Sequence, residues 1–340
     1  MIETFSAGSA VELAVVERSG FIESRHVGSA AVVTPEGELL LGLGDVQTPI
    51  FPRSTLKPFQ TIASLGAGAE LTEEQVAIAS ASHGGTPRHV ALVRDILAKV
   101  GLDDRALGCP ADWPLDRASR DGLVRAGEQQ QAVCMNCSGK HAAMLAACVA
   151  QGWPIDSYLA PEHPLQVAVR EVIERLTTER PAASGVDGCG APVHAISLTG
   201  LARGIARIRT ANASSPFALF RNAARVASAC LAHGWAVDGP GRPNTVVIEE
   251  LGVLAKTGAE GVLTMAAPDG TTVALKMLDG NARAATLVGL QLLVTAGVVP
   301  VAEVQRIVPR LDLEVLGRGA QVGAIRIGRD VPTQMPAPQG

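Results

Sequence analysis

The chain has 340 residues, of which 47% are hydrophobic and 18% are charged, and this composition excludes a disordered protein. Its 29 Lys and Arg residues against 33 Asp and Glu residues give a formal charge of −4, which argues against binding to a nucleic-acid backbone. Aromatic residues make up only 3%, so the core has to be built mainly from Ala, Val, Leu and Ile.

The N-terminal segment and the cysteines bear on the cellular compartment. Glutamates interrupt the apolar residues near the N-terminus, and no run of about 18 apolar residues occurs in the chain. We therefore expect neither a secretory signal peptide nor a membrane-spanning helix. In such a chain the six cysteines are expected to be reduced thiols or metal ligands, and the expected location is the cytoplasm.

Near the N-terminus, short apolar or alternating runs separated by turn residues predict strands. The expected strands cover Val11–Arg18, Phe21–His26, Ala30–Val33 and Leu39–Leu43. The apolar spacing then changes to a helical one over residues 54–234.

Helix starts can be located within this middle segment. Thr86 before Pro87 predicts an N-cap residue followed by a proline in the first turn. A second helix is expected to begin at Pro164, and Ser215–Pro216 predicts the start of a third.

Strands return towards the C-terminus. Gly261–Ala267 and Thr271–Leu278 predict a hairpin whose turn is Pro268–Gly270. A helix is expected near Asn281–Ala296, and a last strand is expected at Ala324–Ile327.

Strands at both ends of a long helical segment predict an α/β (α+β) fold, with one sheet formed from both termini and a helical subdomain inserted. We predict a single domain over residues 1–328, with its sheet in 1–50 and 255–328 and its helices mainly in 54–250. Residues 329–340 are rich in proline and are expected to form a disordered tail.

A Ser-x-x-Lys motif, Ser54 to Lys57, lies at a predicted helix start. If Ser54 caps the helix, the amine lies one turn from the hydroxyl, and the positive field of the helix N-terminus favours a developing alkoxide. A lysine that acts as a base at pH 7 needs a pKa about 3 below its usual value, which burial and a second cation can supply. The motif is short, and a helix cap followed by a solvated lysine also explains it.

Three other segments carry polar groups that suit a cleft. Ser82 ends a predicted helix, Glu73–Ser82, at a glycine pair, and Lys276 lies between apolar neighbours on a predicted strand. Asp187–Pro192 is a turn-rich loop that contains Cys189. Taken alone, each has a structural explanation: a helix end, an edge-strand lysine and a tight connection with a buried thiol.

Cys134 and Cys137 form a C-x-x-C pair, but no second pair follows with zinc-ribbon spacing. Cys137 and Lys140 are three residues apart at a helix start, and Cys189 would have to come from a distant loop. Two thiolates suit zinc, whereas an amine ligand must first lose its proton. Spacing alone therefore favours a structural role over a metal site.

Six segments, taken in order, resemble the bacterial L-asparaginase family typified by the thermolabile Rhizobium enzyme. Together they span roughly residues 10 to 328, and six in register are far more specific than any one of them. The matching segments are Phe51–Gln60, Ala81–Val90, Asn136–Leu145, Asp187–Pro192, Leu254–Val262 and Val273–Ala285.

The resemblance implies a serine β-lactamase/glutaminase-like fold, a homodimer, and hydrolysis of L-asparagine to L-aspartate and ammonia. It also implies two Ser–Lys pairs, Ser54 with Lys57 and Ser82 with Lys276. Two lysines in one cleft would each depress the pKa of the other, which supplies the shift that a lysine base needs.

Further positions follow from the same resemblance. Those implied near the substrate are Arg53, His141 and Asp187. Those implied as zinc ligands are Cys137, Lys140 and Cys189, with the metal beside the substrate site and not the hydrolytic agent. One departure is Asn244, where an aspartate is expected, and it bears on substrate preference.

The sequence thus predicts a covalent amidohydrolase. Ser54 would attack the side-chain amide of asparagine and Lys57 would take its proton, while Ser82 with Lys276 would relay a proton to the leaving ammonia. Both serines have a lysine partner in this scheme, so the sequence leaves open which of them is the nucleophile.

Two alternatives remain. A penicillin-binding protein or β-lactamase shares the Ser-x-x-Lys motif, but the predicted strand Thr271–Leu278 carries no Lys-Thr-Gly and no secretion signal is expected. From another class, the chain could be a zinc-dependent regulator that uses Cys137 and Cys189 on an inactive hydrolase fold. Bound metal without ammonia release from any amide would identify it.

Overall fold

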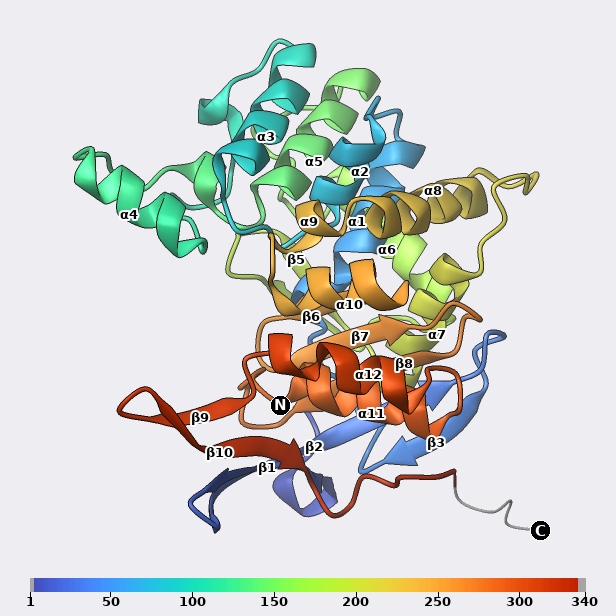
Figure 1. Cartoon of the computed structure of the whole chain (residues 1–340). Helices are drawn as coiled ribbons and strands as arrows, with labels where there is room; N and C mark the ends of the chain where they lie inside the picture. Colours follow the sequence, from blue (N-terminus) through green and yellow to red (C-terminus); the bar gives the residue numbers. More distant parts are fainter. Residues whose placement is uncertain (1–2, 336–340) are drawn as a thin grey trace.

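The two ends of the chain form one antiparallel sheet, and the segment between them is mainly helical (Figure 1). The structure, a computed structural model, describes residues 3–335. In spatial order the sheet contains β6 (Leu254–Gly258), β7 (Val262–Ala266), β8 (Thr272–Met277), β2 (Phe21–Val33), β1 (Val11–Arg18), β10 (Ala320–Ile327) and β9 (Glu314–Gly317), and β3 (Leu39–Leu43) pairs with the second half of β2. The predicted α/β class, with one sheet from both termini and a helical insertion, is confirmed.

The longest strand, β2, covers residues that the sequence predicted as two strands. Gly28 separates the two predicted runs, because a glycine within a strand pattern weakens the signal. In the structure a Cβ atom at this position would lie 2.1 Å from the carbonyl oxygen of Lys276 on β8. The glycine therefore marks a close approach of two strands and not the end of one.

The predicted hairpin is present as β7 and β8, and Gly270 in its turn has a φ of +100°. The strand before it, β6, was not predicted. It pairs with β7 at one edge of the sheet and lies against the 3₁₀ turn Arg53–Leu56. This edge therefore joins the C-terminal strands to the start of the helical segment.

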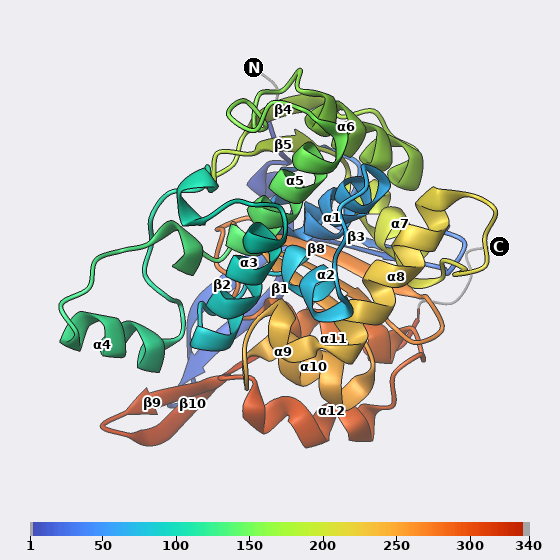
Figure 2. The ribbon, with the colours of Figure 1, turned by 90° about the horizontal axis from the view of Figure 1, so that it is seen from above.

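The helices of the middle segment form the layer above the sheet in Figure 1. They are α1 (Lys57–Gly66), α2 (Glu73–Ala79), α3 (Pro87–Lys99), α4 (Arg117–Arg125), α5 (Ser138–Gln151), α6 (Pro164–Thr177), α7 (Leu198–Arg209), α8 (Ala218–Ala232), α9 (Gly234–Val237) and α10 (Pro243–Leu251). A two-stranded hairpin, β4 (Ala183–Val186) and β5 (Pro192–Ala195), lies within the same segment. Seen from above, α4 projects away from the other helices (Figure 2), and it buries none of its residues.

Two of the predicted helix starts are confirmed. Thr86 caps α3 by accepting a hydrogen bond from the backbone N–H of His89, and Pro87 lies in the first turn. Pro164 begins α6. The third helix, α8, begins at Ala218, because Ser215 ends a turn instead of capping the helix.

Near the C-terminus, α11 (Ala285–Thr295) packs on β7 and β8, and α12 (Val301–Ile307) contacts α10. The chain beyond β10 stays in contact with the sheet. The backbone N–H of Glu12 donates to Asp330, and the Thr295 hydroxyl donates to the carbonyl of Pro332. The last five residues of the predicted tail, 336–340, lie outside the described residues. Over residues 3–335, no helix has both the length and the hydropathy needed to cross a bilayer.

Candidate active site

Ser54 lies in the one-turn 3₁₀ helix Arg53–Leu56, directly before α1. The Ser-x-x-Lys argument supposed that Ser54 caps the helix, but the residue preceding α1 is Leu56, and no side chain caps that end. The helical turn begins four residues earlier than the α-helix itself, which places Ser54 inside the turn. Its side chain is free to line a cavity instead of binding a backbone N–H.

The residue before Ser54 has an unusual backbone conformation. Arg53 has a φ of +54°, in the left-handed region that costs non-glycine residues energy. Its Nε donates to Asp187 Oδ1 at 2.7 Å, and Nη1 lies 3.8 Å from Glu260 Oε1. Two of the three residues predicted near the substrate, Arg53 and Asp187, therefore form an ion pair that fixes the turn carrying Ser54.

Lys57 is buried, and its amine points away from solvent towards three oxygen atoms. Nζ donates to the carbonyl oxygens of Ala81 and Asn136 and lies 3.0 Å from Ser82 Oγ. Burial, reinforced by the charge of Lys140, lowers the pKa of Lys57 below its usual value. The serine that the Lys57 amine contacts is therefore Ser82. Among the described residues, no hydrogen bond joins Lys57 to Ser54, the partner that was predicted.

A second amine reaches the same hydroxyl. Lys256 on β6 donates from Nζ to Ser82 Oγ at 2.9 Å and to the carbonyl oxygen of Thr257 at 2.7 Å. Burial and the nearby charge of Lys57 lower the pKa of Lys256 to about 7. Ser82 thus lies between two buried lysines, at least one of which has a substantial neutral fraction at physiological pH.

The predicted pair of Ser82 with Lys276 is not formed. Lys276 Nζ donates to the carbonyl oxygen of Glu260 at 2.7 Å, in the turn between β6 and β7. The strand register explains this: Lys276 lies opposite Val262, whereas Lys256 lies opposite Thr264. Both lysines are on the same face of the sheet, but β8, which carries Lys276, is two strands away from β6. The residue of β8 that lies level with Lys256 is Ala274, so Lys276 is displaced by two residues along its strand. Lys276 therefore stabilises the turn, and Lys256 occupies the place predicted for it.

The sequence contained a signal for Lys256 that the sequence analysis missed. Lys256, Thr257 and Gly258 form a Lys-Thr-Gly motif, which with Ser-x-x-Lys is typical of β-lactamases and penicillin-binding proteins. The motif was sought only on the strand Thr271–Leu278, and it lies on the unpredicted strand β6. Of the two reasons given against a β-lactamase-like protein, the absence of a Lys-Thr-Gly motif was therefore wrong.

Ser82 is held by the loop that follows α2. The predicted helix Glu73–Ser82 ends at Ala79, so Ser82 lies in an extended segment whose N–H donates to the carbonyl of Val237 at 3.0 Å. The ring of His83 contacts Ser138 Oγ at 2.9 Å. These bonds connect the loop to both α9 and α5 and fix the hydroxyl between the lysines.

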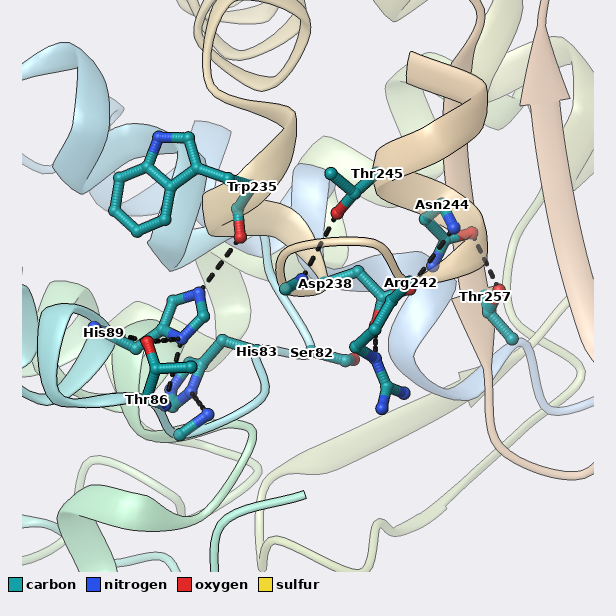
Figure 3. Close-up of polar contacts among 12 residues, drawn as sticks. Ser82, His83, Thr86, His89, Trp235, Asp238, Arg242, Asn244, Thr245 and Thr257 are labelled. Atoms are coloured by element: carbon teal, nitrogen blue, oxygen red, sulfur yellow. Dashed lines mark hydrogen bonds and ion pairs between the residues drawn. The ribbon is translucent and has the colours of Figure 1, made fainter. Parts of the chain in front are cut away.

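Ser54 and Ser82 line one open cavity of about 440 Å³. On one wall, Asp238 accepts a hydrogen bond from Arg242 Nε at 2.6 Å, and Asn244 Oδ1 accepts one from the Thr257 hydroxyl at 2.9 Å (Figure 3). Asn244 thereby connects α10 to the Lys-Thr-Gly strand. Polar groups of the cavity wall include Asn136, Asp238, Arg242, Asn244, Thr257, Arg283 and Asp312.

Deeper in the protein, the structure brings the three predicted zinc ligands together. Lys140 Nζ donates to Cys189 Sγ at 2.9 Å, and Cys137, whose thiol donates to Asn136 Oδ1 at 3.0 Å, lies close enough to Cys189 to affect its pKa. All three residues are buried. Cys137 and Lys140 come from the start of α5, and Cys189 comes from the loop between β4 and β5, as predicted.

The charges in this cluster favour one thiolate. The hydrogen bond from Cys189, together with the nearby amines of Lys57 and Lys140, lowers the pKa of Cys137 well below its usual value. The same hydrogen bond, with burial, raises the pKa of Cys189. The two sulfurs suit a soft cation such as zinc, whereas Lys140, whose pKa the neighbouring cysteines raise, would have to lose its proton before joining them as a ligand. Within residues 3–335, no group of three His, Cys, Asp or Glu side chains lies together as a metal site.

His141, also predicted near the substrate, is fully buried on α5. Its Nδ1 contacts the Tyr158 hydroxyl at 2.6 Å, and its Nε2 has no hydrogen-bond partner among the described residues. Burial, followed by the charges of Lys140 and Lys57, lowers the pKa of His141 well below its usual value. The imidazole is therefore neutral at physiological pH.

The antiparallel sheet, the inserted helices and a serine held between two buried lysines agree with an amidase or serine-hydrolase fold, the class that the family match supports. Residues 14–327 match the sequence model of the L-asparaginase II family, so the chain belongs to that family. This confirms the family resemblance found in the sequence. No curated protein matches the chain significantly.

Solved structures with a similar fold are distant in sequence. A protein titled Mglu, in its glutamate form, is 15% identical with a TM-score of 0.46, covering 78% of this chain and 60% of that one. A Bacillus glutaminase is 12% identical with a TM-score of 0.44, covering 80% and 92%. A β-lactamase from Mycobacterium bovis is 17% identical with a TM-score of 0.38, covering 84% and 95%. This chain spans 60 to 66% of the length of the first three similar structures.

Proposed function

We propose that the chain is an L-asparaginase, an amidohydrolase that converts L-asparagine to L-aspartate and ammonia through a covalent acyl-enzyme. The observation that supports this best is the hydroxyl of Ser82, held by Lys57 and Lys256 in the cavity that Ser54 also lines. Membership of the L-asparaginase II family supports the substrate.

In the acylation step, Ser54 Oγ forms a bond to the side-chain amide carbon of asparagine, and its proton passes to neutral Lys57. Ser54 suits this role because it lines the open cavity on a turn fixed by Arg53. Two of the Lys57 contacts are with carbonyl oxygens, which can only accept hydrogen bonds. The lone pair of the neutral amine is therefore left for a serine hydroxyl; the hydroxyl within reach is that of Ser82, at 3.0 Å, and the proposed step requires the Ser54 hydroxyl to approach the amine when the substrate is bound.

The leaving group needs a proton, and Ser82 is the proposed donor. As the carbon–nitrogen bond breaks, the nitrogen takes the proton of the Ser82 hydroxyl, and the Lys57 ammonium replaces it. Lys256 holds the Ser82 oxygen through its own hydrogen bond. Ammonia leaves, and water then hydrolyses the ester to release aspartate and restore Ser54.

Gly258 brings β6 close to the Ser54 turn. A Cβ atom at this position would lie 2.7 Å from the Pro52 carbonyl oxygen and 3.4 Å from the Ser54 backbone nitrogen. Only a glycine allows this approach, which supports an oxyanion site built from backbone N–H groups at this junction. Each such donor is typically worth about 2.7–4 kcal/mol of transition-state stabilisation.

The direct test is ammonia release from L-asparagine and L-glutamine, measured in parallel with the purified full chain. We expect release from L-asparagine, and loss of release in Ser54→Ala. A wild-type chain that releases ammonia from neither amide contradicts the proposal.

A second candidate function has one specific observation in its favour. The Lys-Thr-Gly motif on β6 lies beside Ser54, as expected for a penicillin-binding protein or β-lactamase. Incubation with a chromogenic cephalosporin, followed by mass spectrometry of the intact chain, tests it. A stable acyl adduct or rapid cephalosporin hydrolysis, without ammonia release from asparagine, favours this alternative.

Zinc, oligomeric state and location complete the proposal. Cys137, Lys140 and Cys189 would hold zinc, which would shape the substrate pocket and tune affinity without generating the nucleophile. We also propose a homodimer, which light scattering of the purified chain would detect. All six cysteines are free and buried within the described residues, which supports a reducing, cytoplasmic location.

A further inference from the structure

The segment Val273–Ala285 contributed Lys276 to the predicted site, but the structure places a different residue of that segment at the cavity. Arg283 lies two residues before α11 and lines the same cavity as Ser54 and Ser82. Nothing in the proposed reaction uses it. The question is therefore what a guanidinium does on this wall.

The guanidinium is held in one orientation by neutral acceptors. Arg283 Nε donates to His26 Nε2 at 2.8 Å, and Nη2 donates to Ser24 Oγ at 3.1 Å. His26 is buried on β2, and its Nδ1 contacts Asp279 Oδ2 at 2.6 Å. Because Nε2 accepts from arginine, the hydrogen-bond network assigns the imidazole proton to Nδ1, which donates to Asp279. A neutral histidine, itself oriented by a carboxylate, thus fixes Arg283.

The other arginine of the cavity differs in its partner. Arg242 donates directly to the carboxylate of Asp238, which is nearly buried. None of the ion pairs within residues 3–335 involves Arg283, and Asp279 reaches it only through His26. The remaining charged group on the wall is Asp312, which is exposed. Of the two arginines that line the cavity, Arg283 is therefore the one that forms no ion pair with a carboxylate of the described residues.

A fixed guanidinium with unused N–H donors matches a carboxylate, because the fork of donors fits two oxygen atoms. We propose that Arg283 binds the α-carboxylate of the amino-acid substrate, with His26 and Asp279 as positioning residues. The assignment rests on the proposed function, since it places the carboxylate of asparagine opposite the serines that attack its side-chain amide. Arg53 is less suited to this task, because it is already paired with Asp187.

The test compares a change in the enzyme with a matched change in the substrate. Arg283→Gln is measured with L-asparagine and with L-asparaginol, in which a neutral hydroxymethyl group replaces the α-carboxylate. For L-asparagine we expect KM to rise about tenfold to a hundredfold with kcat within about threefold, as for the loss of a charged hydrogen bond. For L-asparaginol, kcat/KM should not change, because the charge that Arg283 recognises is absent.

Further variants separate positioning from folding. Asp279→Asn should raise the KM for L-asparagine by a smaller factor, and Arg283→Lys should restore part of the binding. The matched control is Arg105→Gln, which removes an exposed arginine paired at the surface with Asp103. It should leave both substrates unaffected.

The outcomes distinguish this inference from the proposed function. A wild-type chain that releases no ammonia from L-asparagine overturns the proposed function. In an active wild-type chain, an equal loss on both substrates in Arg283→Gln, or an unchanged KM for L-asparagine, overturns the carboxylate assignment. Binding of L-aspartate, measured by calorimetry, gives a second readout: it should weaken in Arg283→Gln and not in Arg105→Gln.

Discussion

The open cavity and the buried thiol cluster hold lysines of the same type in different surroundings. At the cavity, Lys256 contacts a serine hydroxyl and a backbone carbonyl, so its amine is surrounded by neutral oxygen atoms. Lys57 contacts the same hydroxyl and two carbonyls, but it also lies near Cys137 and so stands between the two sites. In the cluster, Lys140 contacts the sulfur of Cys189 and lies near Cys137. Neutral surroundings favour an uncharged amine, and a thiolate favours a charged one.

The opposite pKa shifts of Lys256 and Lys140 indicate that the cavity and the cluster have separate functions. A base needs a neutral amine, and burial supplies it at Lys256, whose pKa is lowered to about 7. At Lys140, burial also disfavours the charge, but Cys189 and Cys137 raise its pKa overall. The cavity is therefore suited to proton transfer and the cluster to binding. Variants of the cavity and of the cluster test this division.

The largest effect is expected for Ser54→Ala, which removes the proposed nucleophile. Activity on L-asparagine should fall at least about a thousandfold, while the fold is retained, because Ser54 caps no helix. Ammonia release measures the activity, and circular dichroism checks the fold. Ser82→Ala is the matched comparison: if the acyl group trapped by rapid quenching is found on Ser82 in Ser54→Ala, the roles of the two serines are reversed.

A second prediction contrasts the lysine that the structure places at Ser82 with the one that the sequence placed there. Lys256→Met should lower kcat about a hundredfold or more, as for the loss of a general acid–base group. Lys276→Met should leave kcat within about fivefold. It should instead cost about 1–3 kcal/mol of stability, because the Glu260 carbonyl loses its donor. Kinetics and thermal unfolding of both variants check this, and the opposite ranking of kcat would support the sequence-based pair.

The lysine partner of Ser82 shows what local sequence information can predict. The helix start at Thr86 and the hairpin after β6 depend on residues close in sequence, and both were predicted correctly. Choosing between Lys256 and Lys276 depends on the register of three strands, which is a non-local property. The sequence pattern indicated a lysine on a strand facing a cleft, but it did not indicate β6, the strand whose lysine contacts Ser82.

Ser54 illustrates a second limit. Its motif was found, but the turn that carries it depends on the left-handed conformation of Arg53. That conformation is held by Asp187, which lies 134 residues further along the chain. No local pattern encodes such a contact. By contrast, the gathering of Cys137, Lys140 and Cys189 was anticipated because the family resemblance links segments that spacing alone could not.

A third prediction concerns the cluster. The double variant Cys137→Ser/Cys189→Ser should lose about one zinc per chain, bind L-asparagine more weakly and retain measurable turnover. The reason is that the Ser–Lys groups of the cavity need no metal to accept or donate protons. Elemental analysis and KM measurement check this, and Cys148→Ala is the control because Cys148 is a buried thiol elsewhere on α5. Loss of all turnover on gentle chelation, restored by zinc, would contradict the division between cavity and cluster.

A fourth prediction is that kcat/KM rises with pH through a midpoint near 7 and falls on acidification. The sign follows from the lysines: the pKa of Lys256 is lowered to about 7 and that of Lys57 is also lowered, so protonation below these values removes the neutral amine. A pH–rate profile between pH 5 and 10 measures the midpoint (~7, the lowered lysine pKa). An acidic optimum would be incompatible with a lysine base.

The smallest effect is expected for Asn244→Asp, which introduces the carboxylate that the resemblance leads one to expect at this position. Asn244 accepts a hydrogen bond from Thr257, the residue after Lys256, so a carboxylate there adds a negative charge close to the amine. A negative charge favours the ammonium form, and the midpoint of the pH profile should therefore move upward by about 0.5. Asn244→Ser is the matched neutral control, since its hydroxyl can still accept a hydrogen bond while adding no charge. A midpoint that moves equally in both variants would show that the hydrogen bond, and not the charge, acts on Lys256.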